Sequence, residues 1–382
     1  MNDLRRRAFS DEHIAFRDMV KRFIQSEITP NLADWENVGE VARAVWDSAG
    51  ALGLLGLNIP REFGGGDADF TFNAILGEEL VRAGAGSVTL PLTNDIVLPY
   101  LAEYATAEQK QRWLPDICAG RTIAAIAMSE PGAGSDLRAI RTTAVRDGDH
   151  YRLTGSKTFI TNGILADVVI VAAVTPRADA DPALSLLVVE RDTPGFVRGK
   201  KLHKIGRHAN DTAELFFEDA LVPVSNLLGE EGRGLHYLMS NLPQERLSIA
   251  LSAVAGAERA LDLTVDYAKS RKAFGRSIGS FQANRFTLAE MATEVRIARV
   301  FVDEMVARHV GGSLDPAEAA MAKWWTTELE NRIATQGLQL HGGYGYMREY
   351  PIAQAFLDAR VQTIYGGTNE IMKEIIGRTL GL

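Results

Sequence analysis

The stretch Asn241-Leu-Pro-Gln-Glu245-Arg246-Leu247 decides how the chain is interpreted, together with the distant loop Ile364-Tyr-Gly-Gly-Thr-Asn-Glu370. The first stretch places a carboxylate on a predicted helix, with apolar neighbours in the sequence at Leu242, Leu247, Ile249 and Leu251. Apolar surroundings disfavour the charged form of a carboxyl group and raise its pKa, which suits a base that acts near neutral pH. Glu245 is therefore the candidate base.

A purely structural role would also explain Glu245. With Leu242 as the N-cap and Pro243 at the first helical position, the carboxylate would lie in the first turn of a helix and complement the positive end of the helix dipole. Spacing alone favours this structural interpretation. The residues that favour the role of Glu245 as a base lie in other segments of the chain.

The composition is that of an ordinary globular protein. The chain has 382 residues, of which 46% are hydrophobic and 24% charged, which is enough for roughly two to three domains with their own cores. The formal net charge of −8 gives no electrostatic footprint for a nucleic-acid partner. The single cysteine, Cys118, excludes an intrachain disulfide and a thiolate zinc cluster, and it fits a reducing compartment.

Targeting and membrane segments are not expected. Ser10-Asp-Glu12 follows the basic residues Arg5 to Arg7 and is typical of a helix start, which leaves no apolar signal segment, so we expect a cytoplasmic protein. The longest apolar run, Val168 to Val174, is far shorter than the roughly 20 residues that span a bilayer. We expect no membrane span and a buried strand at this run.

Residues 1–122 are predicted to form an α-helical domain. Apolar side chains recur at helical spacing after Ser10, and Pro30 ends that helix. Further helices are expected at 41–52, around 72–80, at 94–104 and at 107–118.

Residues 123–231 are predicted to form a middle β-sandwich or barrel domain, because the apolar period changes from 3.6 to 2 near Ile123. The pair Asp147-Gly148 suits a tight hairpin turn. Other strands are expected at 151–161, 168–174, 184–190 and 213–217.

Residues 232–382 are predicted to form a C-terminal four-helix bundle. A long helix passes Glu245 and reaches Ser270, with a kink expected near Pro243. The other helices are expected at 281–310, 316–340, 352–360 and from Asn369 onward. The fold class is therefore a multidomain α+β protein in the order α, β, α.

Four segments carry a family resemblance. They are Met128-Ser-Glu-Pro-Gly-Ala-Gly-Ser-Asp136, Lys157-Thr-Phe-Ile-Thr-Asn-Gly163, Arg271-Lys-Ala-Phe-Gly-Arg276, and Gln339-Leu-His-Gly-Gly-Tyr-Gly-Tyr346 with the loop 364–370. In this order and in these domain types, they resemble the acyl-CoA dehydrogenase family over essentially the whole chain. Pro243-Gln-Glu-Arg246 and Gly366-Gly367 are most similar to the long-chain branch.

The resemblance implies an activity and its participants. An acyl-CoA would be dehydrogenated to the trans-2-enoyl-CoA, as in fatty-acid β-oxidation, with FAD as cofactor and no metal. Glu245 would remove the α proton while the β hydrogen leaves as hydride to flavin N5. Electrons would pass to an electron-transfer flavoprotein, and the protein would be a homodimer or homotetramer.

The resemblance also assigns residues to the flavin ring. Met128 and Ser129 would lie along the isoalloxazine, and the Thr161 hydroxyl would reach N5 beside Phe159. Without the resemblance, Phe159 and Thr161 would be a core pair, because alternate residues of a strand share a face.

A second set of implied FAD contacts lies far from the first set in the sequence. Arg271, Phe274 and Gln282 would hold the FAD of a neighbouring subunit, and the other members of the set are Gln339, Gly342, Gly343, Thr368 and Glu370. Structural roles exist for some of these residues. Arg271 and Phe274 could be a solvated arginine and a core phenylalanine at a helix end, and Thr368 and Glu370 could be an N-cap and a first-turn acid.

The implied substrate contacts are Ser135, Leu242, Arg246, Tyr365 and Gly366. Tyr365 would lie by the thioester, and the Gly366 N–H would donate to its oxygen together with a ribityl hydroxyl of FAD. Many members of the family carry the catalytic Glu at the position of Gly366, and others at the position of Glu245; this chain has the second arrangement.

Three alternatives to the long-chain dehydrogenase remain open on the sequence alone. One is an acyl-CoA oxidase, in which the reduced flavin reacts with oxygen. The others are a branched-chain acyl-CoA dehydrogenase and a non-catalytic flavoprotein subunit of a hetero-oligomer. The presence of Glu245 argues against the non-catalytic subunit.

Overall fold

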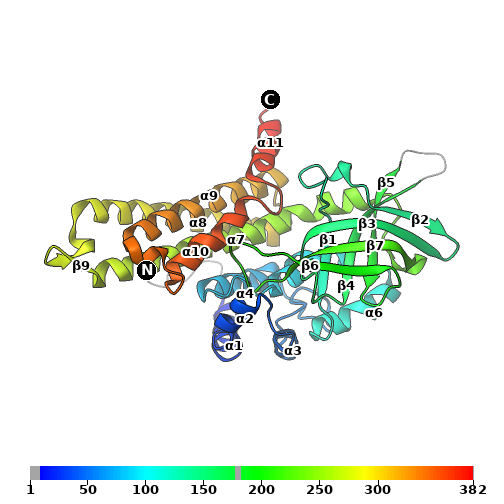
Figure 1. The fold of residues 1–382 in the computed structure, drawn as a ribbon, viewed down its shortest axis with the longest axis horizontal. Helices are drawn as coiled ribbons and strands as arrows, with labels where there is room; N and C mark the ends of the chain where they lie inside the picture. Colours follow the sequence, from blue (N-terminus) through cyan, green and yellow to red (C-terminus); the bar gives the residue numbers. More distant parts are fainter. Residues whose placement is uncertain (1–8, 177–181, 382) are drawn as a thin grey trace.

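The computed structural model describes residues 9–176 and 182–381. Figure 1 shows a sheet at one end of an elongated molecule, long helices that extend away from it, and short helices beside the junction of the two. The parts follow the predicted order α, β, α, and the exact domain boundaries stay predictions.

Short helices with side-chain caps form the N-terminal part. Ser10, Asp69 and Thr106 each accept a backbone N–H at the start of a helix, which satisfies donors that the helix itself leaves free. The helices are α1 (Asp11–Phe23), α2 (Leu32–Val38), α3 (Ala44–Ala51), α4 (Phe70–Arg82), α5 (Leu98–Tyr104) and α6 (Ala107–Cys118). Two differences from the prediction are α2, which was missed, and the segment 94–104, which is divided into a π-helix (Leu92–Val97) and α5.

The middle part is one sheet with strand order β6-β7-β3-β2-β4-β5-β8, and β1 also pairs with β4. The strands are β1 (Ala124–Ala127), β2 (Thr143–Asp147), β3 (His150–Thr161), β4 (Val168–Thr175), β5 (Ala183–Glu190), β6 (Phe196–Lys201), β7 (Thr212–Pro223) and β8 (Leu227–Leu228). The predicted hairpin joins β2 to β3, but its two-residue loop is Gly148-Asp149, one residue later than predicted, because Asp147 pairs with His150.

Strand β4 is buried on both faces, which explains its unbroken apolar run. Val168, Ile170 and Ala172 pack in the core cluster shared with α5 and α6. The alternate residues Val169 and Val171 pack in a cluster on the opposite face. The sheet is thereby fixed to the N-terminal helices, and the ends of β1 and β3 are held near the pocket described below.

The C-terminal part is a helical bundle built around α7 (Gly234–Ser270), which packs on α9, α8 and α4. The remaining elements are β9 (Lys272–Ala273), β10 (Arg276–Ser277), α8 (Gln282–Val310), α9 (Pro316–His341), α10 (Pro351–Ala359) and α11 (Asn369–Thr379). Pro243 lies inside α7, whose N-cap is Arg233. The structural interpretation of Glu245 as a first-turn residue is therefore wrong, since Glu245 lies roughly three turns into the helix.

Two possible features are absent from the described part of the chain. No helix within residues 9–176 and 182–381 is both long and apolar enough to cross a membrane. The same residues contain no group of three His, Cys, Asp or Glu side chains arranged to hold a metal ion.

Candidate active site

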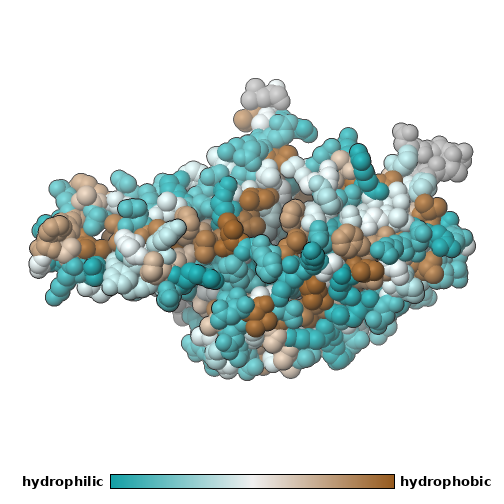
Figure 2. Space-filling view, viewed as in Figure 1, coloured by the Kyte–Doolittle hydropathy of each residue, from teal (hydrophilic) through white to brown (hydrophobic). Residues whose placement is uncertain are grey.

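A cavity of about 690 Å³ lies where α4, the ends of the strands, α7 and the loop before α11 meet. Figure 2 shows apolar side chains gathered in the middle of this face, between the sheet and the bundle. The candidate base and nine residues predicted for the flavin or the substrate line the cavity: Glu245 with Met128, Ser129, Ser135, Phe159, Thr161, Leu242, Arg246, Tyr365 and Gly366. Residues from three separate parts of the sequence are thus brought together.

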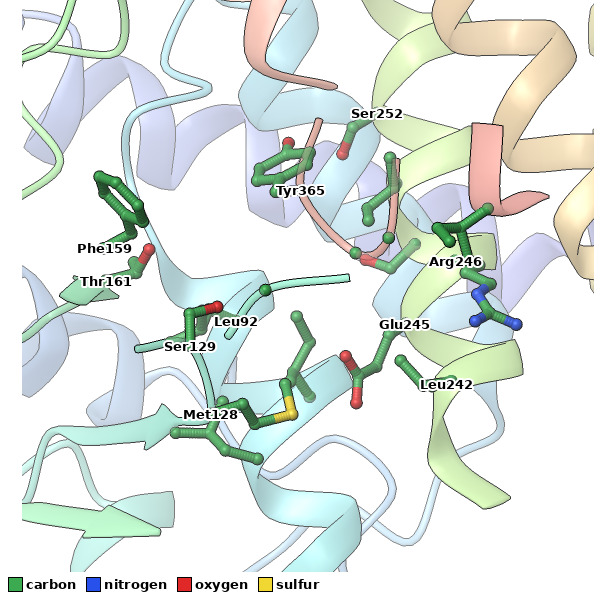
Figure 3. Close-up of a pocket in the computed structure, with 18 of the residues that line it drawn as sticks. Leu92, Met128, Ser129, Phe159, Thr161, Leu242, Glu245, Arg246, Ser252 and Tyr365 are labelled. Carbon is green, nitrogen blue, oxygen red and sulfur yellow. The ribbon is translucent and has the colours of Figure 1, made fainter. Parts of the chain in front are cut away.

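Glu245 points into this cavity from α7, and Arg246 contributes to the lining with its guanidinium directed away from the Glu245 carboxylate (Figure 3). Glu245 is 3% exposed. Burial raises its pKa to about 7, although a hydrogen bond from Tyr100 and the nearby charge of Arg246 favour the ionised form. The hydroxyl of Tyr100 donates to Glu245 Oε1 at 2.8 Å. A carboxylate with this pKa can both accept and release a proton near neutral pH.

The loop that carries Gly366 is held in a conformation suited to glycine. Gly366 and Gly367 have φ values of +63° and +89°. The buried Lys323 ammonium donates to the Gly367 carbonyl at 2.8 Å and to Asn369 Oδ1 at 2.9 Å. Among the described residues, no backbone carbonyl accepts the Gly366 N–H. The loop therefore presents a fixed donor at the edge of the cavity.

Tyr365 is anchored on the same loop. Its hydroxyl donates to Gln362 Oε1 at 3.1 Å, and Gln362 Nε2 donates to the buried Glu330. The Arg207 guanidinium lies 5.8 Å from the centre of the Tyr365 ring. These contacts fix the ring where it lines the cavity.

The end of β3 differs from the regular strand that was predicted. The pairing of β3 with β7 is irregular between Lys157 and Ile160, and Phe159 has a φ of +60°. Such a bulge re-aims a side chain, and Phe159 is 71% exposed. The interpretation of Phe159 and Thr161 as a core pair is therefore wrong, and both line the cavity instead.

The segment that follows β1 is tied to β3. Lys157 is fully buried, and its ammonium donates to the Met128 carbonyl at 3.0 Å and to Glu130 Oε1 at 2.8 Å. The Thr158 N–H donates to the Ser129 carbonyl at 3.0 Å. Gly132 and Gly134 have open space where a side chain would begin. This segment thus offers anchored backbone beside open space at the mouth of the cavity.

The second set of predicted cofactor residues does not line this cavity. Arg271 follows the last residue of α7, and Phe274 lies in the turn between β9 and β10, at the end of the bundle far from the sheet (Figure 1). Phe274 is 95% exposed, so its interpretation as a core residue at a helix end is wrong. The other members, Gln282, Gln339, Gly342 and Gly343, are exposed as well. Within a single chain, the two sets of predicted FAD contacts therefore lie apart.

Thr368 and Glu370 also lie outside the cavity lining. Thr368 is the N-cap of α11 and accepts the Ile371 N–H, and Glu370 lies in the first turn, as the structural interpretation predicted. Their place in the sequence next to Gly366 keeps them close to the loop that lines the cavity.

Tyr100 and the apolar lining from α4 and the π-helix were not predicted from the sequence. Leu80, Val81, Leu92 and Ile96 contribute to that lining. Their spacing had indicated only helices with a buried face. No local pattern signals the Tyr100 contact, since it joins residues 145 positions apart.

The architecture and the cavity together define a three-part α, β, α protein with a buried carboxylate at an apolar cavity. Models of the N-terminal, middle and C-terminal domains of acyl-CoA dehydrogenases match residues 10–121, 125–220 and 232–381. The long-chain specific acyl-CoA dehydrogenase of Sus scrofa mitochondria is 52% identical over 98% of this chain and 88% of the pig protein. The chain belongs to the acyl-CoA dehydrogenase family.

Solved structures agree with this assignment. An acyl-CoA dehydrogenase from Geobacillus kaustophilus has a TM-score of 0.96 and 51% identity, covering 98% of this chain and 100% of that one. An acyl-CoA dehydrogenase from Bacillus anthracis complexed with FAD has a TM-score of 0.91 and 32% identity, covering 98% and 67%. The predicted fold class and family are confirmed, and FAD is the cofactor of the family.

The residues present fit a flavin. An apolar ring at Phe159 that is 71% exposed offers a surface for another aromatic group, since burial of aromatic area is favourable. The Thr161 and Ser129 hydroxyls beside it lie on the cavity lining and can bond to polar ring edges. At Gly342 and Gly343 no other atom lies within 4 Å of the place that a Cβ would occupy, which permits close approach of a ligand to the backbone.

Proposed function

We propose that this protein dehydrogenates long-chain acyl-CoA thioesters with Glu245 as the base. The observation that carries the proposal is a buried carboxylate, with a pKa raised by burial to about 7, that points into an apolar cavity of about 690 Å³. FAD-dependent dehydrogenation of an acyl-CoA is the activity of the family. The choice of base and the chain length are proposals for this chain.

Glu245 would remove the α proton of the bound acyl thioester. Negative charge then develops on the thioester oxygen, and a fixed donor at that oxygen stabilises the transition state more than the ground state. The Gly366 N–H, on the anchored loop next to Tyr365, is the proposed donor. FAD, when bound, supplies the acceptor for the β hydrogen.

Residues of the cavity would also hold the cofactor and substrate. We assign Met128, Ser129, Phe159 and Thr161 to the flavin ring, and Ser135, Leu242, Arg246 and Tyr365 to the substrate. The apolar lining from α4 and the π-helix would receive the acyl chain, since burial of each methylene contributes about 0.8 kcal/mol. Gly77 adds no side chain to that lining. The 50 to 52% identity to long-chain specific relatives supports a long acyl chain.

The cofactor would be shared between two subunits. Arg271, Phe274 and Gln282 are exposed and lie far from the cavity of their own chain, so a neighbour could bring them to the FAD of another subunit. Exposed apolar side chains on α8, at Phe286, Ile297 and Val300, support assembly. We propose a homodimer or homotetramer, with an electron-transfer flavoprotein as electron acceptor.

Arg271→Ala is expected to weaken FAD retention while the fold remains stable. An arginine fork suits a diphosphate, and Arg271 is exposed, so its removal changes the folded chain little. Flavin released during gel filtration and the thermal midpoint of the protein stripped of FAD are the two measurements. The control is Arg285→Ala, which is also exposed and near the start of α8. Unchanged FAD affinity in Arg271→Ala would show that the assignment across subunits is wrong.

A panel of acyl-CoA chain lengths tests the proposed substrate. We expect the purified chain to carry about one FAD per subunit, and saturated long-chain acyl-CoA to bleach the flavin without oxygen faster than short or branched ones. Preference for a branched or short substrate would contradict the long-chain proposal. Rapid peroxide formation in air would indicate an oxidase, and a flavin that no acyl-CoA bleaches would indicate a non-catalytic subunit.

A further inference from the structure

The hydroxyl of Tyr100 reaches the proposed base from outside the cavity. Tyr100 lies on α5, is fully buried, and packs in the core cluster that includes Leu98 and Trp113. It does not line the cavity, but its hydroxyl donates to Glu245 Oε1 at 2.8 Å. Among the described residues, no other hydrogen bond to this carboxylate is formed. Oε2 is therefore the oxygen left for a bound substrate.

Few other ionisable groups change the pKa values of Glu245 and Tyr100. Arg246 on the same helix is the other ionisable group that acts on Glu245. Tyr104 and Glu103 on α5 face Tyr100. Asp95, from the π-helix before α5, is engaged by Asn73 at 2.9 Å and by Ser248. Tyr100 is thus the group on α5 that donates a hydrogen bond to the carboxylate.

We propose that Tyr100 is a positioning residue that favours the ionised form of the Glu245 carboxylate through the bond to Oε1. This inference rests on the proposed role of Glu245 as the base. A phenol that donates to a carboxylate stabilises the charged form of the acid. Burial, together with the charge of Glu245, raises the pKa of Tyr100 well above its usual value, so the phenol stays a donor over the whole range in which Glu245 titrates.

The hydrogen bond determines in which direction the pKa of Glu245 changes when Tyr100 is replaced. Burial raises the pKa of Glu245 to about 7 and the Tyr100 hydrogen bond opposes that increase. Tyr100→Phe removes the opposition and keeps the ring, so the pKa of Glu245 rises further. A hydrogen bond to a charged group is strong enough to change that pKa by about 1. A base with a higher pKa is less ionised at neutral pH, and the limiting rate of flavin reduction falls there.

The kinetic test is the pH profile of flavin reduction at saturating acyl-CoA, measured by stopped flow without oxygen. For wild type we expect the rate to rise with pH through about 7. For Tyr100→Phe we expect a rate about fivefold lower at about pH 7 and nearly equal at about pH 9.5, because a pKa higher by about 1 reduces the ionised fraction of Glu245 by about that factor near neutral pH. A profile that superimposes on wild type, or one lowered equally at every pH, would overturn the proposal.

Two further measurements separate this proposal from its premise. The matched control is Tyr104→Phe. It removes, from the next turn of α5, a phenolic hydroxyl that does not contact Glu245. The pH profile of this variant should match that of wild type. The infrared band of the protonated carboxyl, isolated by subtracting the Glu245→Gln spectrum, gives the pKa of Glu245 without turnover. A raised infrared pKa in Tyr100→Phe supports the bond even if Glu245→Gln proves active, and an unchanged one overturns it.

Discussion

Glu245→Gln is expected to reduce the rate of flavin reduction by an acyl-CoA by at least about 10²–10⁴-fold, the contribution of a positioned base. Glutamine keeps the size of the side chain and can still accept the Tyr100 hydrogen bond through Oε1, but it cannot take up the α proton. The cavity lining stays the same, so binding of FAD and of acyl-CoA should survive.

The measurement is the single-turnover bleaching of the flavin by stopped flow, with acyl-CoA affinity measured by titration. Asp266→Asn is the matched control, because it makes the same change from acid to amide on an exposed residue of α7. That variant should reduce its flavin at the wild-type rate. Near-normal reduction in Glu245→Gln would remove Glu245 as the base and leave the proposed mechanism without one.

The positions of many elements could be predicted because local chemistry determines them. Ser10 and Thr368 are helix caps in the structure as predicted, since their side chains satisfy backbone donors of the following turn. The apolar run from Val168 to Val174 could be assigned to a strand, because both faces of β4 are buried. That the predicted site residues lie together at one cavity could be expected only from the family resemblance, because no local sequence pattern indicates it.

Contacts between distant segments account for what the sequence did not reveal. Pro243 would normally begin or break a helix, and it led to the first-turn interpretation of Glu245. In the structure α7 continues through it, because that helix is packed against α4, α8 and α9. Likewise Phe159 leaves the strand pattern at a bulge in the pairing of β3 with β7. Neither effect has a signature within a few residues of the site.

The second large effect that we expect is a partial recovery of the rate when the base is moved from Glu245 to the Gly366 loop. The family resemblance implies a catalytic Glu either at the position of Gly366 or at that of Glu245, and in this chain both positions line one cavity from different elements. Glu245→Gly should be as slow as Glu245→Gln. Adding Gly366→Glu should restore part of the rate, because a carboxylate would again reach the substrate α carbon.

The structure indicates why that restoration is incomplete and how to improve it. Gly366 has a φ of +63°, which strains any residue with a Cβ by about 1–2 kcal/mol, and this corresponds to about a tenfold loss. A Cβ at this position would also overlap Cδ1 of Ile249. We therefore expect Glu245→Gly with Gly366→Glu to remain about tenfold or more below wild type.

The triple variant that adds Ile249→Val should be faster than the double variant, since valine lacks Cδ1 and removes the overlap while the strain remains. Ile249→Val alone is the control. It should change the wild-type rate little, because Gly366 has no side chain that Cδ1 of Ile249 would overlap. Stopped-flow bleaching ranks wild type, Ile249→Val, Glu245→Gly, the double variant and the triple variant. A triple variant no faster than Glu245→Gly would show that the two positions do not converge on one substrate carbon.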